Sequence, residues 1–292
     1  MTRTADPVRP QTPAPAGRRA GRLARRHPAT ARLLTQWQAA RLRGRHGMPE
    51  MAACHHLATP GSLAVDVGAS VGNFTRALVR AVGRDGHVLA LEANPQVYEE
   101  LRRSTWSSHV TALNLAASDD AGWARLSIPL DGAVPAGQLS TLEAPDGRAA
   151  LHTTVRRIRL DDLIGAARPV SLLKIDVEGH ESAVLAGAVE TIERWRPAVV
   201  AEIEQRHLNG RTVADVAGAL LAHGYTAWGL RGRSLLPWAE FDQHRHQQQW
   251  LSTPDGGGLS RITAPHEYVN NFVFLPVERA ADADGLRDRL AR

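Results

Sequence analysis

The stretch LAVDVGASVG, residues 63–72, joins a short apolar run to two glycines. Leu63 to Val67 has the length and composition of a buried strand, and Gly68 and Gly72 mark a tight turn after it. Residues 74–82 then show the apolar spacing of a helix. The stretch therefore predicts a strand, a glycine turn and a helix, which in a doubly wound sheet is where a nucleotide-like ligand binds.

The same alternation continues along the chain. Helices are expected between most of the later strands, and this spacing predicts an α/β fold with a doubly wound, mostly parallel, seven-stranded sheet. No helix is expected between the last two strands, so we expect the last one to insert antiparallel at an edge. The later strands are expected at residues 87–91, 110–115, 170–177, 198–203, 226–230 and 271–275, the helices at 95–104, 181–195 and 212–223, and a hairpin within 119–151.

Charge is distributed unevenly between the N-terminal segment and the rest of the chain. Residues 1–50 contain eleven arginines and two acidic residues, a formal charge of +9, so the other 242 residues carry −4 of the total of +5. We expect a basic, disordered arm with a short amphipathic helix at 29–45 (residues 1–50), a catalytic domain (51–277) and a C-terminal helical tail (278–292). An acidic body makes nucleic acid an unlikely partner.

Cysteine usage and hydropathy exclude several classes of protein. The single cysteine, Cys54, excludes a disulfide framework and a thiolate zinc cluster. No apolar run approaches the roughly 18 residues that a membrane span requires. The arginine pairs near the N-terminus are not followed by an apolar stretch, so no secretory signal is expected. We expect a soluble, cytoplasmic protein.

The glycine turn and an acid after the second strand together predict a cofactor site. Gly68 would let the backbone approach a ligand, and Gly72 would let the helix pack close to the strand. Glu92 follows Gly72 by 20 residues, where an acid commonly accepts hydrogen bonds from ribose hydroxyls. The turn lacks the three-glycine pattern of dinucleotide-binding enzymes, which favours S-adenosylmethionine over NAD. Asp66 either belongs to this site or forms the turn.

Lys174 is the only lysine among 35 basic residues. Because side chains alternate along a strand, Lys174, Asp176 and, if the strand continues, Glu178 share one face at the active-site edge of the sheet. Glu202 and Glu204 end the fifth strand in the same way. A lysine among carboxylates is a structural ion-pair network, a general base with its orienting partners, or a divalent-metal site built from oxygen ligands.

Seven segments resemble, in order and spacing, the FkbM family of S-adenosylmethionine-dependent methyltransferases. They are residues 66–72, 92–95, 114–119, 159–163, 174–181, 185–188 and 196–202. The resemblance covers about residues 60–205, and KIDVEGHE, residues 174–181, is its most specific part. It implies a class I methyltransferase, Rossmann-like fold and, most often, O-methylation of a small-molecule hydroxyl on a sugar or other natural-product scaffold of secondary metabolism.

The resemblance also suggests which residues line the cofactor. Two positions depart from the family pattern: Ser70 stands where Asn is usual, and His180 where a small or aromatic residue is usual. His180 either adds a titratable group or begins the next helix. The suggested cofactor residues are Asp66, Gly68, Ala69, Ser70, Gly72, Glu92, Ala93, Ser118 and Asp119.

Methyl transfer to oxygen requires removal of the hydroxyl proton, because a neutral alcohol is a poor nucleophile. Asp176 is the first candidate, as base or metal ligand, with Glu178 and His180 as alternates. Lys174 would hold the carboxylates or stabilise an alkoxide, and Glu202 completes the catalytic set. Participation of a divalent metal is open. We expect Asp176→Asn to abolish turnover and to leave cofactor binding nearly intact.

The connection at residues 231–268 follows the carboxyl end of a parallel strand, so we expect it to overhang the site and contact the acceptor. Trp238 and Trp250 lie in it, although the usual role of such rings is to bury apolar area. His244, His246 and residues 247–249 have the composition of a solvated loop.

Two other classes of function stay open. A nucleic-acid methyltransferase is suggested by the basic arm. Against it, the fourth strand does not end in the Asn/Asp-Pro-Pro-aromatic motif that resembles amino-directed enzymes. An enzyme that methylates the 5-position of a pyrimidine needs a nucleophilic cysteine near the site, whereas Cys54 precedes the first strand. The second alternative is a non-catalytic S-adenosylmethionine-binding protein, which a cofactor-turnover assay separates from an enzyme.

Overall fold

The computed structural model describes most of the chain after residue 47. Residues 1–47, which include the helix expected at 29–45 and all but the last three residues of the expected basic arm, lie outside the described residues. The described residues are 48–131, 134–135, 137–143, 150–165, 168–252, 261–263 and 265–291.

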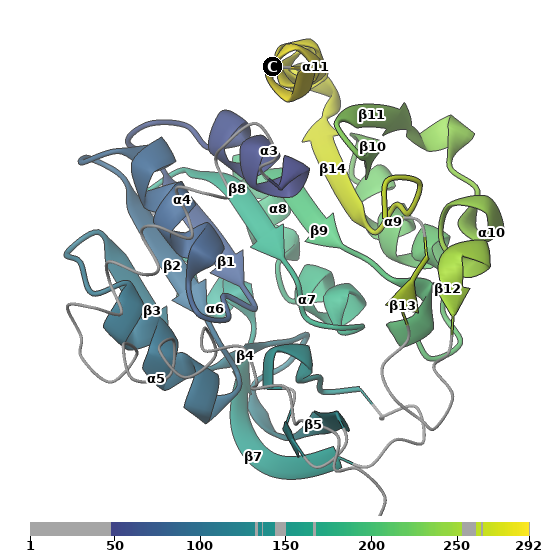
Figure 1. Cartoon of the computed structure of the whole chain (residues 1–292). Helices are drawn as coiled ribbons and strands as arrows, with labels where there is room; N and C mark the ends of the chain where they lie inside the picture. Colours follow the sequence, from purple (N-terminus) through teal and green to yellow (C-terminus); the bar gives the residue numbers. More distant parts are fainter. Residues whose placement is uncertain are drawn as a thin grey trace, which may run out of the picture.

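The main sheet contains eight strands in the described part of the chain (Figure 1). β3, β2, β1, β8 and β9 pair in parallel, whereas β14 runs antiparallel to both of its neighbours. The spatial order is β11 (Ser234–Pro237), β10 (Tyr225–Arg231), β14 (Asn271–Pro276), β9 (Ala198–Glu202), β8 (Val170–Ile175), β1 (Leu63–Val67), β2 (His87–Leu91) and β3 (Val110–Leu113).

This topology confirms the class I methyltransferase fold, a mostly parallel sheet with an antiparallel last strand. The expected edge position of that strand is wrong, because β14 lies between β9 and β10. Every residue of β14 is buried, and its apolar run is typical of a strand covered on both faces and paired on both sides. β11, paired antiparallel with β10, adds an eighth strand that the sequence did not indicate.

Alternate side chains of the strands pack into two cores, one on each face of the sheet. On β8, Leu172 belongs to the core with α3, α4 and α11, and Leu173 to the core with α7, α8 and α9. The helices on the two faces are α3 (Pro49–Leu57), α4 (Asn73–Val82), α5 (Pro95–Ser104) and α11 (Asp282–Ala291) on one side, and α6 (Leu160–Leu163), α7 (Glu181–Ala186), α8 (Val189–Trp195) and α9 (Val213–Leu221) on the other.

The helix expected at 181–195 is two helices, α7 and α8. The carboxylate of Asp161 accepts hydrogen bonds from the backbone N–H groups of Glu190 and Thr191, at 3.1 and 2.9 Å. It therefore caps a new helix N-terminus, where the N–H groups have no partner within the helix. Strand β8 ends at Ile175, two residues before the expected boundary, where its pairing with Val67 of β1 and Ala201 of β9 also ends.

The excursion between β3 and β8 forms a second sheet at the carboxyl edge of the main one (Figure 1). The expected hairpin is present as the antiparallel pair of β5 and β6. The strands of this sheet are β4 (Ala116–Ala117), β7 (Ala150–Ile158), β5 (Gly122–Asp131) and β6 (Val134–Pro135), and the short helix η1 (Gly137–Leu139) follows β6.

The described elements of the connection between β10 and β14 are short. The two ends of the described chain meet on one face of the main sheet. α11 packs against α3, and Arg279 donates to the carbonyl oxygen of Leu57 at 3.2 Å. None of the described helices is long and apolar enough to cross a membrane. The remaining elements are η2 (Gln205–His207), η3 (Trp238–Glu240), α10 (Gln243–His246), η4 (Gln248–Trp250), β12 (Leu251–Ser252), β13 (Arg261–Ile262) and η5 (Val277–Arg279).

Candidate active site

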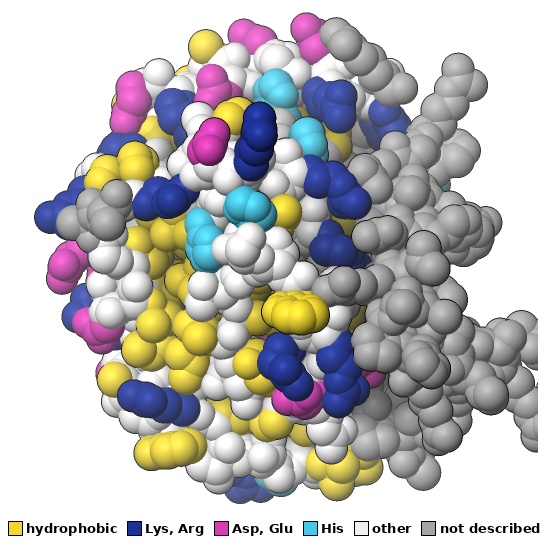
Figure 2. Space-filling model, turned by 90° about the vertical axis from the view of Figure 1, so that its left-hand side faces the viewer, with side chains coloured by type: hydrophobic (Ala, Val, Ile, Leu, Met, Phe, Trp, Pro, Cys, Tyr) yellow, Lys and Arg dark blue, Asp and Glu magenta, His cyan; other side chains and the backbone are white. Residues whose placement is uncertain are grey.

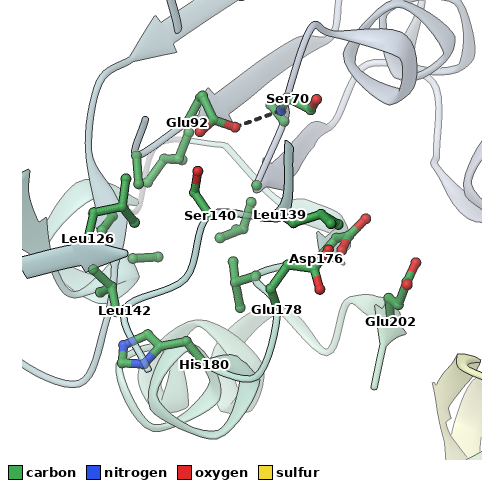
Figure 3. Close-up of a pocket in the computed structure, with 18 of the residues that line it drawn as sticks. Ser70, Glu92, Leu126, Leu139, Ser140, Leu142, Asp176, Glu178, His180 and Glu202 are labelled. Carbon is green, nitrogen blue, oxygen red and sulfur yellow. Dashed lines mark hydrogen bonds between the residues drawn. The ribbon is translucent and has the colours of Figure 1, made fainter. Parts of the chain in front are cut away.

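A cavity of about 280 Å³ opens at the carboxyl ends of β1, β2, β8 and β9 (Figure 3). This is the edge of an open α/β sheet at which ligands bind. One wall comes from the turn after β1 and the end of β2, and the opposite wall from the segment after β8. The second sheet and residues 137–142 cover it.

The glycine turn is held by the neighbouring strand. The backbone N–H groups of Gly68 and Ala69 both donate to the carbonyl oxygen of Leu91, at 2.9 and 2.8 Å. Gly68 has a φ of 75°, and a Cβ atom there would overlap the carbonyl oxygen of Asp176. Gly68 thus allows the turn after β1 to contact the end of β8, in addition to lining the cavity.

Glu92 presents a fixed carboxylate to the cavity. It accepts hydrogen bonds from the backbone N–H groups of Ser70 and Asn94, at 2.9 and 2.8 Å. Burial raises the pKa of Glu92 to about 7, although these two bonds act in the opposite direction. A carboxylate held in this way has lone pairs left for the two hydroxyls of a ribose.

Two asparagines missed by the sequence interpretation build the same wall. The side-chain amide of Asn94 donates to Ser140 Oγ at 3.0 Å, and that of Asn114 donates to the carbonyl oxygens of Glu92 and Ala93. Asn94 and Asn114 lie in segments that resemble the family, but the resemblance does not assign them a role. Only the structure gives the partners.

The part of the cavity next to Glu92 is lined by small and apolar side chains. Such a lining could hold the flat, uncharged base of the cofactor expected from the sequence. The side chains include Ala93, Leu115, Ala116, Ala117, Leu126 and Leu142. Glu92 could accept hydrogen bonds from the hydroxyl groups of this cofactor, and the apolar side chains could contact its base.

Four of the expected cofactor residues do not line the cavity. Asp66 is buried behind it and accepts a hydrogen bond from Thr75 at 2.6 Å, and burial raises the pKa of Asp66 to about 6. Gly72 faces Leu101 and Thr105 at the end of α5. Ser118 is buried, and the Asp119 beside it is exposed. Gly68, Ala69, Ser70, Glu92 and Ala93 do line the cavity.

Lys174 lies under α3 and α4 and does not line the cavity. Its side chain is 1% exposed, its Nζ atom is 3.4 Å from Oδ2 of Asp176, and the Phe74 ring lies 5.0 Å away. Burial alone would lower the pKa of Lys174, but the carboxylates of Asp176 and Glu202 hold that pKa above its usual range. Lys174 is therefore a permanent cation.

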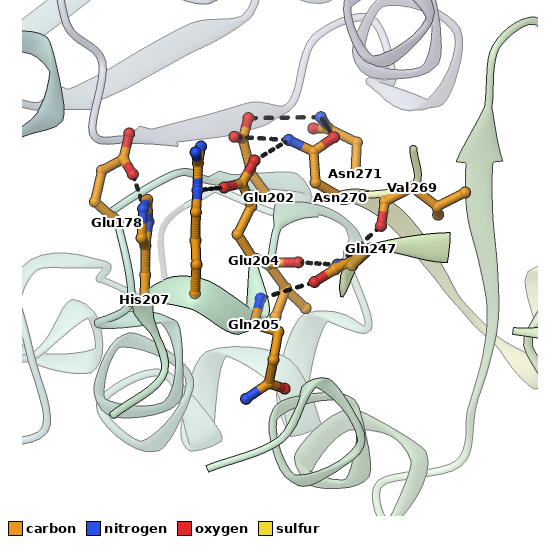
Figure 4. A network of polar contacts seen from close by, with 12 residues as sticks. Glu178, Glu202, Glu204, Gln205, His207, Gln247, Val269, Asn270 and Asn271 are labelled. Atoms are coloured by element: carbon orange, nitrogen blue, oxygen red, sulfur yellow. Dashed lines mark hydrogen bonds and ion pairs between the residues drawn. The ribbon is translucent and has the colours of Figure 1, made fainter. Parts of the chain in front are cut away.

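Three carboxylates, Asp176, Glu178 and Glu202, line the cavity at the end opposite Glu92 (Figure 3). Asn270 donates to Oε1 of Glu202 at 2.9 Å and to Oε1 of Glu204 at 2.8 Å, and so joins the two acids that end β9 (Figure 4). Burial, followed by the charge of Asp176, raises the pKa of Glu202 well above its ordinary value. These groups can accept protons or hydrogen bonds from a hydroxylated ligand.

His180 lies at the start of a helix and at the cavity, and its expected role as a titratable group stays a prediction. It is the residue before α7, and its ring also lines the cavity. Nδ1 lies 2.8 Å from Oε1 of Glu143, and Nε2 lies 3.0 Å from Oγ of Ser118. The hydrogen bond from His180 lowers the pKa of Glu143. His180 thus ties the 137–143 segment to the residue after β4.

The expected overhang by residues 231–268 is wrong for the part of that connection that the structure describes. Leu126 and residues 137–142 cover the cavity instead. Trp238 stacks on Phe241 and contacts Phe272 in the core, and the indole N–H of Trp250 donates to the carbonyl oxygen of Arg245. Both rings bury apolar area or close a local turn.

The solvated loop expected around His246 is also wrong in part. His246 and Gln247 are buried, whereas His244 and residues 248–249 are exposed. The amide of Gln247 donates to the carbonyl oxygens of Ile203 and Val269, both at 2.8 Å, and accepts from the backbone of Gln205 (Figure 4). Because three backbone groups satisfy it, this side chain can be buried.

In the described part of the chain, no group of three or more His, Cys, Asp or Glu side chains is placed to hold a metal ion. The carboxylates beside Lys174 are paired with Lys174, His207 and Asn270. Metal dependence stays an open prediction.

Comparison with known families agrees with this geometry. The model of the methyltransferase FkbM domain matches residues 66–227, more than half of the chain. The chain belongs to the FkbM methyltransferase family. It is thus an S-adenosylmethionine-dependent methyltransferase, as the KIDVEGHE motif indicated.

Individual relatives of this FkbM-family chain are distant. It is 29% identical over 198 residues to 31-O-demethyl-FK506 methyltransferase FkbM of Streptomyces tacrolimicus, over 57% of this chain and 74% of that protein. A methyltransferase FkbM structure from Methylobacillus flagellatus has 17% identity and a TM-score of 0.43, over 73% of this chain and only 43% of that one. An O-methyltransferase from Bacillus cereus in complex with SAH has 14% identity and a TM-score of 0.39, over 85% and 88%.

Proposed function

We propose that this chain is an O-methyltransferase that acts on a hydroxyl group of a sugar or natural-product scaffold. The observation that carries the proposal is a single cavity with Glu92 and the glycine turn at one end and Asp176, Glu178 and Glu202 at the other. The first end suits the methyl donor, and the second can accept the proton of a hydroxyl group. The name of the Streptomyces relative, which refers to an O-demethyl compound, is consistent with oxygen as the acceptor atom.

Different residues would bind the cofactor and contact the acceptor during methyl transfer. S-adenosylmethionine, when bound, supplies an electrophilic methyl group on a positively charged sulfur. Glu92 would hold ribose hydroxyls, and the Gly68–Ser70 turn would bring the donor against the end of β8. Asp176, Glu178 and His180 stand where an acceptor hydroxyl can reach them, and Asp176 was the first candidate base from the sequence. Lys174 fixes Asp176 from beneath.

The charge of the cavity favours a neutral acceptor over a phosphorylated one. Four carboxylates line it, and among the described lining residues there is no lysine or arginine. A nucleic acid would bring phosphate groups toward these carboxylates, which costs electrostatic energy. On the face of the molecule in Figure 2, basic and acidic side chains lie among each other on the left side, and several basic side chains lie on the right side. We therefore rank nucleic-acid methylation second.

The test is a methyl-transfer assay with the full chain and S-adenosylmethionine. The acceptor panel holds 31-O-demethyl-FK506, methyl α-D-glucoside, methyl α-L-rhamnoside and a single-stranded RNA. We expect S-adenosylhomocysteine to form only with a small-molecule acceptor, and NMR of the product to place the new methyl group on oxygen. A methyl group on nitrogen or carbon would contradict the proposal.

Cofactor binding without turnover for any acceptor would favour the non-catalytic alternative. The same assay after exhaustive chelation tests the metal, because retained activity removes any need for one. The expected cytoplasmic location stays a prediction.

A further inference from the structure

His207, in η2, contacts one of the carboxylates that line the cavity. Its Nδ1 atom lies 2.7 Å from Oε2 of Glu178, and the two side chains are only 15% and 14% exposed (Figure 4). His207 itself is not among the residues that line the cavity. Any effect of this histidine on a ligand therefore passes through Glu178.

The backbone around Glu178 is held tightly in an unfavourable conformation. The φ of 53° at Glu178 lies in the left-handed region, which is unfavourable for a residue with a side chain. At Gly179, with a φ of 104°, a Cβ atom would overlap the carbonyl oxygen of His207. The hydroxyl of Thr141 donates to the carbonyl oxygen of Glu178 at 2.8 Å. These contacts hold the backbone of Glu178 in place, and the contact with His207 holds its carboxylate.

Asp176 has a different kind of partner. It faces Lys174, whose Nζ atom lies 3.4 Å from Oδ2 of Asp176 and whose charge is permanent. A histidine loses its charge near neutral pH. When His207 is neutral, its Nδ1–H group can still donate to Glu178, so the carboxylate keeps its orientation without an adjacent cation.

We propose that Glu178, oriented by the Nδ1–H group of neutral His207, takes the proton of the acceptor hydroxyl. This role presupposes the methyl transfer proposed above and assigns to Glu178 the step for which Asp176 was the first candidate. The hydroxyl oxygen bonds to the methyl carbon, the electron pair of the broken carbon–sulfur bond stays on sulfur, and the proton passes to Oε1 of Glu178. His207 is a positioning residue in this step.

The charges around the pair determine its pH dependence. Burial acts to lower the pKa of His207, but the bond to Glu178 and the Glu178 charge outweigh burial, and the pKa lies above its usual value. Below that pKa, Glu178 faces a second cation, so turnover rises as His207 loses its proton. The charged groups that face Glu178 are His207, Asp176, Glu181 and Glu202, and those that face His207 are Glu178, Glu204 and Arg206.

Two substitutions at His207 separate orientation from titration. His207→Ala should lower kcat about tenfold to a hundredfold, with KM and cofactor affinity nearly unchanged. It should also move the acid limb of the pH–rate profile to lower pH, because the histidine no longer titrates. His207→Asn places an amide N–H near the position of Nδ1–H. It should therefore restore part of kcat and leave the acid limb at the lower pH.

The matched control is His223, which pairs with Glu193 at 3.4 Å on the surface. His223→Gln should leave both kcat and the profile unchanged. The rates are measured with the panel compound that is methylated, and the melting temperature of each variant is recorded. A profile whose acid limb stays in place in both His207 variants would overturn the proposal, as would a Glu178→Gln variant with wild-type turnover.

An acceptor-independent measurement keeps the pair testable if no compound is methylated. In the full chain labelled with ¹⁵N-histidine, we expect His207 to titrate above about 6.5 in the wild type. In Glu178→Gln, burial dominates and the pKa of His207 should fall to or below that value. A His207 titration that does not respond to Glu178→Gln contradicts the pairing, whereas absence of methyl transfer by the wild type contradicts only the proposed function.

Discussion

Lys174–Asp176 and His207–Glu178 are two cation–carboxylate pairs at the end of the same strand. The first has its cation 1% exposed beneath helices α3 and α4, with a charge that does not change at physiological pH. The second has a titratable cation at the margin of the cavity, and its carboxylate sits on strained backbone. The difference suggests that the first pair serves mainly the fold, and that the second can change its protonation during a reaction.

The largest effect should come from removing the buried cation. Lys174→Met leaves the carboxylates of Asp66 and Asp176 without their neutralising charge, and should lower the free energy of unfolding by about 3–5 kcal/mol. Urea denaturation measures this loss. Arg287→Met, which breaks an exposed pair with Asp284, should cost less than about 1 kcal/mol. Equal losses in the two variants would contradict a structural role for Lys174.

Replacing the carboxylates of Glu178 and Asp176 by amides should have different effects on kcat and on stability. Glu178→Gln should lower kcat by about 10²–10³-fold with little change in stability, because it removes the proton acceptor. Asp176→Asn should lower kcat by a smaller factor and the melting temperature by more, because Lys174 loses its partner. A larger loss of kcat in Asp176→Asn would return the proton-accepting role to Asp176, as first expected from the sequence.

At the opposite end of the cavity, Glu92 should make cofactor binding depend on pH. With a pKa of about 7, it is protonated below neutral pH and then accepts hydroxyl donors poorly. Calorimetry should show weaker S-adenosylmethionine binding at pH 6 than at pH 8. Glu92→Gln should bind about tenfold more weakly and with little pH dependence, whereas Glu99→Gln on the exposed face of α5 should behave as the wild type.

The smallest effect should appear in the stability of the free protein. Burial raises the pKa of Asp66 to about 6 and of both Glu92 and Glu181 to about 7. Between about pH 4.5 and 7 the folded chain therefore binds more protons than the unfolded chain, so stability falls as pH rises. His207, with its raised pKa, acts in the same direction. We expect the melting temperature to fall by a few degrees from pH 5.5 to 8, and less in Glu181→Gln.

Most of the fold could be predicted from the sequence, because it is encoded in local patterns. The apolar runs at Leu63–Val67 and His87–Leu91 match β1 and β2 at both ends. The position of β14 could not be predicted in this way, because its neighbours in the sheet depend on which strands lack a partner. Its apolar run from Phe272 to Leu275 was nevertheless a signal that it would be buried on both faces.

The cavity was predicted less completely, because its covering wall depends on contacts between distant segments. Residues 137–143 have no periodicity, and their contacts with Asn94 and His180 span about 40 residues. The sequence predicts that Gln247 is solvated, because its backbone partners at Ile203 and Val269 are distant in the chain. His207 lies 29 residues from Glu178, and no spacing rule connects the two.

The place of β14 in the sheet also sets an order of assembly during synthesis. It is the last strand of the main sheet to be made, yet it lies between β9 and β10, which precede it in the chain. Until residues 271–276 leave the ribosome, β9 and β10 each present an unpaired edge, and the core lacks Phe272 and Phe274. Open strand edges and exposed apolar surface favour aggregation. A nascent chain that stalls before residue 271 is therefore a substrate for chaperones, although its cofactor and catalytic motifs are already complete.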